Sequence, residues 1–202
     1  MSARDEVLAR IRTALGDELP VLAPVVRDYR TADDLPPGDP ALLDLLVDRL
    51  EDYKATVVRC GPDEVAASVA ARVPPGDVVV APGLPAAWRP DGATEDDGRP
   101  AVELASAAAA VTGVAVAVAE TGTLFLDGSP VSGRRALSLL PDFLVCVVTA
   151  DQVVGGVPAG LSRVNPVAPL TMISGPSATS DIELERVEGV HGPRTLVVVL
   201  VT

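Results

Sequence analysis

Hydrophobic and polar residues alternate along most of the chain in a pattern typical of helices followed by short strands. After Pro40, apolar residues at helical spacing over 41–52 give way to a β-branched run at 55–60, and a helix expected at 63–72 precedes valines at 77–81. This repetition favours an α/β fold with a mostly parallel, Rossmann-like sheet and helices on both faces. Strands are also expected at 114–119, 124–127, 143–149, 170–174 and 195–201, with helices over 102–110 and 151–163.

The first residues carry a separate helical pattern. Val7, Ile11 and Leu15 are spaced four apart and Gly16 follows as a stop signal, which predicts an amphipathic helix. We expect this helix either to dock on the body or to bind a partner. The expected organisation is an N-terminal helix at 1–16, a linker rich in Pro and Asp at 17–40, and one α/β domain at 41–202. Within that domain, the Gly- and Pro-rich stretch 82–100 is expected to be an exposed loop.

Length and charge limit the classes of function. A chain of 202 residues with 48% hydrophobic residues supports one substantial core. The net charge of −12 opposes binding to nucleic acid or to an anionic membrane surface. The first 15 residues contain no continuous apolar stretch, so we expect neither a secretory signal nor membrane insertion, and a cytoplasmic location.

The cysteines indicate structural thiols. Cys60 and Cys146 are the only two, and each lies in a β-branched run that predicts a buried strand. Two cysteines cannot supply the four thiolates of an iron–sulfur cluster, and the single histidine cannot complete a usual zinc set. We therefore expect this chain to bind no metal or cofactor of its own. If the protein serves a redox reaction, other chains carry the electrons.

A first candidate site is the sequence Glu120-Thr121-Gly122-Thr123, which separates two apolar runs. A carboxylate at the end of a buried strand can be desolvated, which would raise its pKa and suit a general base or nucleophile. Glu120 is therefore a candidate catalytic residue, with Thr121, Gly122 and Thr123 as candidate binding residues. The structural alternative is a tight turn whose glutamate is solvated or bonded to nearby amides.

A second candidate is the pair Arg134 and Arg135, which follows a stretch bounded by Gly128 and Gly133. The glycine spacing is that of a phosphate loop, but an arginine replaces the expected lysine and Pro130 removes one backbone amide. The two guanidinium groups can still clamp a carboxylate or phosphate. The alternative is a surface basic pair in an acidic protein.

The densest polar segment follows the strand expected at 170–174. Ser180 and Glu183 have the spacing of a capping box, so a helix is expected to begin there with free amides that attract an anion. Ordinary capping explains those two residues but not the neighbouring hydroxyls. The candidate anion-binding residues of this segment are Ser174, Gly175, Ser177, Thr179, Asp181 and Glu183.

His191 is a further catalytic candidate. It lies in the sequence Gly189-Val190-His191-Gly192-Pro193, a turn before the last strand, where an accessible imidazole can act as acid or base near neutral pH. The alternative is a turn residue tied to the backbone. No Gly-x-Ser-x-Gly elbow and no dinucleotide-binding glycine pattern accompany it.

Several ordered motifs together resemble the lactate-utilisation protein C family, also known by its LUD domain. They are 119–124, 135–141, 150–153, 173–183 and 187–193, and the likeness is strong from Thr112 to the C-terminus and covers the first half only in layout. The resemblance implies a fold related to the sugar-phosphate isomerase/CoA-transferase-like proteins. It also implies a non-redox subunit that supports the oxidation of L-lactate to pyruvate beside iron–sulfur partner proteins.

Two other functions compete with this one. Related CoA transferases use a glutamate that follows a strand, so an independent acyl- or CoA-transfer enzyme would use Glu120 as nucleophile, with Ser177, Thr179 and Arg134 holding the anionic substrate. A regulatory ligand-sensing module is the third possibility. In each case the expected ligand is a small organic acid or a phosphorylated compound.

Overall fold

The computed structural model describes residues 2–16, 23–28, 30, 33–176, 178–179, 187–188 and 191–202. Its main feature is a six-stranded sheet in the order β1-β12-β7-β4-β2-β3, and every neighbouring pair is parallel. Its strands are β1 (Thr56–Cys60), β2 (Val78–Val80), β3 (Thr94–Glu95), β4 (Ala109–Gly113), β7 (Phe143–Thr149) and β12 (Thr195–Val201). The predicted parallel α/β class is confirmed.

The centre of this sheet is almost entirely apolar. Strands β7 and β12 pair over seven residues each, from Phe143 opposite Thr195 to Thr149 opposite Val201. Leu144 to Val148 are fully buried, as a strand with both faces covered requires. The core is therefore built from Val, Leu and Ala around these two strands.

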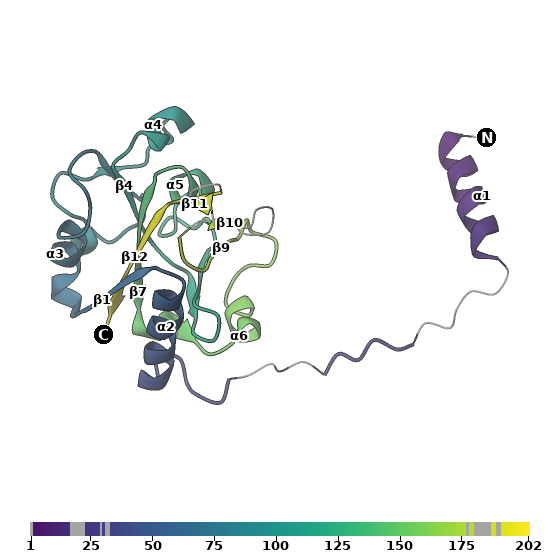
Figure 1. Cartoon of the computed structure of the whole chain (residues 1–202), viewed down its shortest axis with the longest axis horizontal. Coiled ribbons are helices and arrows are strands. Elements are labelled where there is room, and N and C mark those ends of the chain that lie inside the picture. The colour runs from purple at the N-terminus through teal and green to yellow at the C-terminus, as the bar shows by residue number, and fades with distance from the viewer. Residues whose placement is uncertain are drawn as a thin grey trace.

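Helices flank the sheet. Of the α-helices, α2 (Pro40–Asp52) precedes β1, α3 (Val65–Ala70) precedes β2, and α4 (Ala101–Ala105), α5 (Arg135–Leu139) and α6 (Val157–Leu161) follow. The connection from β1 to β2 crosses the sheet in the opposite direction to that from β4 to β7. Since such crossovers are right-handed, α3 and α5 lie on opposite faces, and Figure 1 shows them on opposite sides of the strands. Short 3-10 turns are η1 (Pro62–Glu64), η2 (Ala86–Trp88) and η3 (Ala150–Gln152).

A second sheet of four strands has the order β8-β5-β6-β9. Its strands are β5 (Val116–Val118), β6 (Thr123–Leu126), β8 (Val153–Val154) and β9 (Thr171–Ile173). Strands β5 and β6 form an antiparallel hairpin, and β9 pairs antiparallel with β6. A two-stranded pair, β10 (Ala178–Thr179) and β11 (Val187–Glu188), is also antiparallel. The second sheet positions the candidate residues Glu120 to Thr123, Ser174 and Gly175.

Helix α1 (Ala3–Leu15) matches the predicted N-terminal helix. Ser2 and Asp5 form a capping box at its start, and Gly16 ends it with a φ of 71°. None of its residues is buried, and Figure 1 shows it apart from the α/β body. No helix among the described residues is long and apolar enough to cross a membrane.

Some expected boundaries were wrong. The helix expected over 102–110 ends at Ala105, because Ala109 and Ala110 begin β4. The strand expected over 114–119 is shorter, Val116–Val118, and forms the interior strand β5 of the second sheet. The helix expected over 151–163 is divided into η3, β8 and α6. The stretch 82–100 contains η2 and the edge strand β3, and Trp88 packs partly buried against the core.

Candidate functional site

Strand pairing brings two of the predicted motifs together. Thr123 begins β6 and Ser174 follows β9, and since Leu124 pairs with Ile173 the two side chains become neighbours. Their hydroxyl oxygens lie 2.7 Å apart, and the Thr123 hydroxyl lies 2.7 Å from that of Thr121. Thr123 is buried, whereas Thr121 and Ser174 are exposed. We call these three residues the hydroxyl row; its two outer members, Thr121 and Ser174, can donate and accept hydrogen bonds toward solvent.

Helix α2 lies behind both turns. A Cβ on Gly122, whose φ is 60°, would lie 2.9 Å from the Cβ of Arg49. A Cβ on Gly175, whose φ is 102°, would lie 2.8 Å from both the Cβ and the backbone oxygen of Tyr53. The glycines of both motifs are therefore needed for close packing against the end of α2 as well as for their backbone conformation. Their predicted binding role stays a prediction.

His191 lies beside the second of these turns. It lines a cavity of about 240 Å³ together with Ser174 and Gly175, as well as Met172 of β9 and Pro193. The imidazole is exposed. The cavity thus combines an imidazole, a hydroxyl and apolar side chains, which suits a small polar molecule with a short hydrocarbon part.

Glu120 differs from the expectation of a desolvated carboxylate with a raised pKa. Its side chain is 43% exposed, and both of its oxygens accept hydrogen bonds from Arg30, at 2.8 and 2.6 Å. The hydrogen bonds from the Arg30 guanidinium lower the pKa of Glu120 below its ordinary value. The predicted raised pKa was therefore wrong, and Glu120 is an ionised carboxylate held by a guanidinium.

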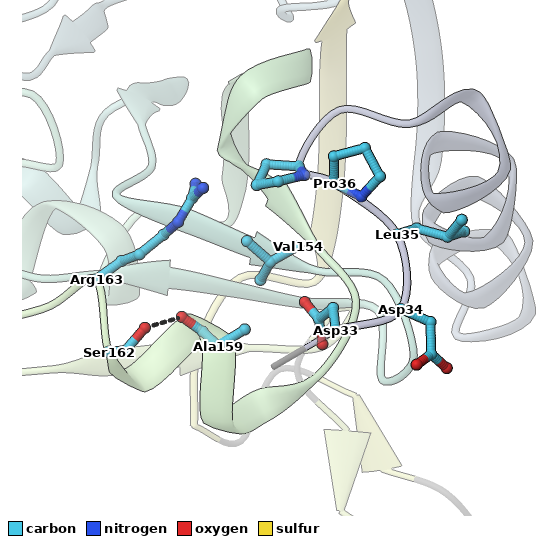
Figure 2. Close-up of a pocket in the computed structure, with 9 residues that line it drawn as sticks. Asp33, Asp34, Leu35, Pro36, Val154, Ala159, Ser162 and Arg163 are labelled. Carbon is cyan, nitrogen blue, oxygen red and sulfur yellow. Dashed lines mark hydrogen bonds between the residues drawn. The ribbon is translucent and has the colours of Figure 1, made fainter. Parts of the chain in front are cut away.

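The segment expected to be a linker supplies two charged residues that sequence reasoning missed. Besides Arg30, the Asp33 carboxylate accepts hydrogen bonds from the backbone amides of Gly155 and Gly156, at 2.7 and 2.9 Å. Glu120 itself donates its backbone N–H to the Gly155 carbonyl, at 3.0 Å. Figure 2 shows the Asp33 side chain beside Val154 and Ala159. No periodicity marks Arg30 or Asp33, so only the fold could identify these contacts.

Arg134 is placed in an ion pair away from the hydroxyl row. Its Nε and one terminal nitrogen donate to the two oxygens of Asp96, at 2.6 and 2.9 Å, and the terminal nitrogen also donates to the Arg99 carbonyl. The Asp96 side chain is only 2% exposed. Arg135 is exposed and borders a very small cavity near Gly128 and Thr171. The predicted arginine clamp stays a prediction, and one of its two guanidinium groups is already used by Asp96.

Part of the predicted anion site cannot be compared with the structure. Ser177, Asp181 and Glu183 lie outside the described residues, as does the helix start expected at Ser180. Thr179 is described only as part of the backbone of β10.

The predicted burial of both cysteines is confirmed. Cys60 and Cys146 are free, buried thiols on β1 and β7, two strands that β12 separates. Burial raises the pKa of Cys146 to about 12, so it stays protonated near neutral pH. Among the described residues, no group of three or more His, Cys, Asp or Glu side chains is arranged to hold a metal ion. The two thiols do not fit an iron–sulfur cluster.

The parallel sheet and the appended four-stranded sheet, which carries the hydroxyl row, define an α/β protein. The LUD domain model matches residues 86–201, and the chain belongs to this family. The chain is 46% identical over 162 residues to a protein named lactate utilization protein C from Deinococcus radiodurans, an alignment that covers 76% of each. It is 32% identical to a protein of the same name from Shouchella clausii, over 39% of this chain and 37% of that one.

A solved structure has the same architecture. The crystal structure of a DUF162 family protein from Deinococcus radiodurans, at 1.70 Å resolution, matches with a TM-score of 0.68 and 36% sequence identity. The match covers 80% of this chain and 97% of that chain. The family resemblance inferred from the ordered motifs is thus confirmed.

Proposed function

We propose that this protein acts in lactate utilisation as a non-redox subunit that supports the oxidation of L-lactate to pyruvate. The observation that carries the proposal is the 46% identity to the Deinococcus radiodurans lactate utilization protein C across three quarters of both chains. Identity of that extent supports a shared role more strongly than a shared fold does.

The cysteine content supports a division of labour with iron–sulfur partner proteins. Lactate oxidation releases two electrons, and the two thiols of this chain are buried on separate strands, where they cannot bind a cluster. Under the proposal the electrons pass to clusters in the partners, and this chain binds a small organic acid or positions a partner. The acidic net charge of −12 is in keeping with a role that requires neither nucleic acid nor membrane insertion, and with a cytoplasmic location.

The cavity beside His191 supports the binding of an organic acid. A neutral or charged imidazole and the Ser174 hydroxyl can both donate hydrogen bonds to a carboxylate, while Met172 offers apolar contact to a methyl group. The Ser174 hydroxyl is also hydrogen-bonded to the buried Thr123 hydroxyl, which holds its oxygen in place.

Growth on L-lactate as sole carbon source tests the proposal. The gene is deleted and complemented with the wild type or with His191→Ala, Glu120→Gln or, as a matched control, Glu103→Gln, which changes an exposed glutamate on α4. We expect growth to be lost on deletion and restored by the wild type and the control but not by His191→Ala. Normal growth of the deletion strain, in a cell with no duplicate system, would remove the lactate role.

A second experiment tests the division of labour. The purified chain is expected to show no lactate-dependent reduction of a dye, whereas the chain mixed with its co-purified partners is expected to reduce it. Reduction by the isolated chain would contradict the non-redox assignment.

Acyl or CoA transfer through Glu120 is the competing function, and the ionised state of this carboxylate favours it. Attack by a Glu120 oxygen on an acyl-CoA would form a mixed anhydride and release CoA thiolate. Incubation with a panel of acyl-CoAs, followed by intact-mass measurement, would then show an adduct that is lost in Glu120→Gln and kept in Glu103→Gln. We expect no adduct as long as Arg30 is bound to both carboxylate oxygens.

A further inference from the structure

The contacts of Arg30 and of residues 33–38 suggest a regulated access to Glu120. We call Arg30 and 33–38 the strap. Gly38 donates its backbone N–H to the Val153 carbonyl at 3.0 Å, Asp33 accepts from the two amides that follow β8, and Arg30 covers the Glu120 carboxylate. The strap thus follows β8 along its length and ends on the candidate catalytic residue.

The amides that hold Asp33 are shaped for a close approach. Gly155 and Gly156 are buried, and a Cβ on Gly155 would lie 2.8 Å from the Asp33 carboxyl carbon. A Cβ on Gly156 would lie 2.2 Å from an Arg30 guanidinium nitrogen. Asp33 and Arg30 are the two anchors of the strap, and both need the space left by the missing side chains of Gly155 and Gly156. This shared requirement links the two anchors.

The strap lies at the surface, between two pockets that are open to solvent. It borders a cavity of about 140 Å³ on the side of Glu120 and one of about 290 Å³ on the side of α6, lined by Ser162 and Arg163 (Figure 2). The Arg30–Glu120 pair is also half exposed, and exposed ion pairs contribute little to stability. The strap is therefore held by a few polar contacts to Glu120, to β8 and to the two glycines that follow β8.

We propose that the strap is an autoinhibitory segment: its docked form takes up the hydrogen-bonding capacity of the Glu120 carboxylate and of the Gly155–Gly156 amides, and its release frees both together. The strap controls access to Glu120 for whichever reaction or ligand uses that residue. This control is independent of the proposed lactate role.

Chemical labelling of Glu120 tests the proposal without any activity assay. The full-length protein is treated with a water-soluble carbodiimide and glycine ethyl ester, and peptide mass mapping gives the labelling rate of Glu120 relative to exposed Glu103. Asp33→Ala removes the carboxylate at the amides. Asp34→Ala is the matched control, since Asp34 is exposed, loses the same charge and points away from Val154 and Ala159 in Figure 2.

Asp33→Ala is expected to raise the relative labelling of Glu120 roughly tenfold, because it removes two hydrogen bonds to a charged acceptor. Asp34→Ala is expected to change it less than about twofold. Asp33→Asn, which keeps one acceptor oxygen, should fall between them. All variants should unfold at nearly the same temperature as the wild type. Equal labelling in Asp33→Ala and Asp34→Ala would overturn the proposal.

A double-variant cycle separates one coupled strap from two independent contacts. Arg30→Ala alone is expected to increase labelling of Glu120 for two reasons. It removes the guanidinium from the carboxylate, and it lets the pKa of Glu120 return toward its ordinary value. If the anchors act as one unit, Asp33→Ala adds little when Arg30 is already replaced. Fully multiplicative effects would show that the two contacts are independent, and would also overturn the strap.

Discussion

Arg134 and Asp96 form a two-point ion pair that fastens the end of β3 to the start of α5. The guanidinium donates to both carboxylate oxygens, at 2.6 and 2.9 Å, and the aspartate side chain is almost fully buried. Removal of the arginine leaves a buried carboxylate without its counter-charge. We expect Arg134→Ala to lower the free energy of unfolding by about 1–3 kcal/mol, since Arg134 itself is partly exposed.

Urea unfolding of Arg134→Ala measures this loss, and Arg135→Ala is its matched control. Arg135 is exposed next to Arg134 in sequence, so its replacement should change the free energy of unfolding by less than about 0.5 kcal/mol. Equal effects of the two substitutions would show that the Asp96 pair does not stabilise the fold.

The same pair predicts a dependence of stability on pH. Hydrogen bonds from Arg134 lower the pKa of Asp96 below its ordinary value near 3.8. A carboxylate with a lowered folded-state pKa contributes stability above its unfolded pKa, and this contribution is lost as the pH falls through the folded pKa. We expect the free energy of unfolding to fall below about pH 4. Asp96→Asn should be less stable at neutral pH and lose less on acidification, and an unchanged pH profile in that variant would contradict the assignment.

The parallel sheet could be predicted from the sequence because its strands are continuous apolar runs between helical patterns. Strand β4 was missed because Ala109 and Ala110 favour helices intrinsically, yet here they are buried in a central strand where small side chains fit. The chain then leaves the first sheet at Val114, whose carbonyl accepts a hydrogen bond from the Gln152 side chain at 2.7 Å. That contact joins residues 38 positions apart and has no local signal in the sequence.

The candidate site was predictable in its parts but not in its arrangement. The motifs at Thr121–Thr123 and at Ser174 stood out as polar residues next to apolar runs, whereas their meeting depends on the pairing of β6 with β9. The contacts of Arg30 with Glu120, 90 residues away, and of Asp33 with Gly155 come from a segment without periodicity. Sequence spacing carries no information about such pairs, which is why the pKa of Glu120 was predicted in the wrong direction.

Gly175 is expected to tolerate no side chain. Its φ of 102° is unfavourable for other residues, and a Cβ would collide with the Tyr53 backbone oxygen. We expect Gly175→Ala to destabilise the protein by about 2–4 kcal/mol in thermal or urea unfolding. Gly92→Ala is the control, because Gly92 also has a positive φ, of 78°, but has open space around its Cβ position. It should cost only about 1–2 kcal/mol, and an equal cost at both glycines would mean that contact with α2 is unimportant.

Helix α1 is expected to matter for association but not for the stability of the body. None of its residues is buried, while Val7, Ile11 and Leu15 are each about half exposed along one side. A helix of 13 residues is only marginally stable alone in water, so this helix gains most of its stability when its apolar stripe packs on another surface.

We expect deletion of residues 2–16 to change the unfolding temperature of the body by less than about 1 °C. Co-purification with the proposed iron–sulfur partners should fall at least severalfold, whereas Val102→Ala, which removes an exposed side chain on α4, should leave it unchanged. A large loss of thermal stability on deletion would mean instead that α1 docks on its own body, and undiminished co-purification would remove it from the partner interface.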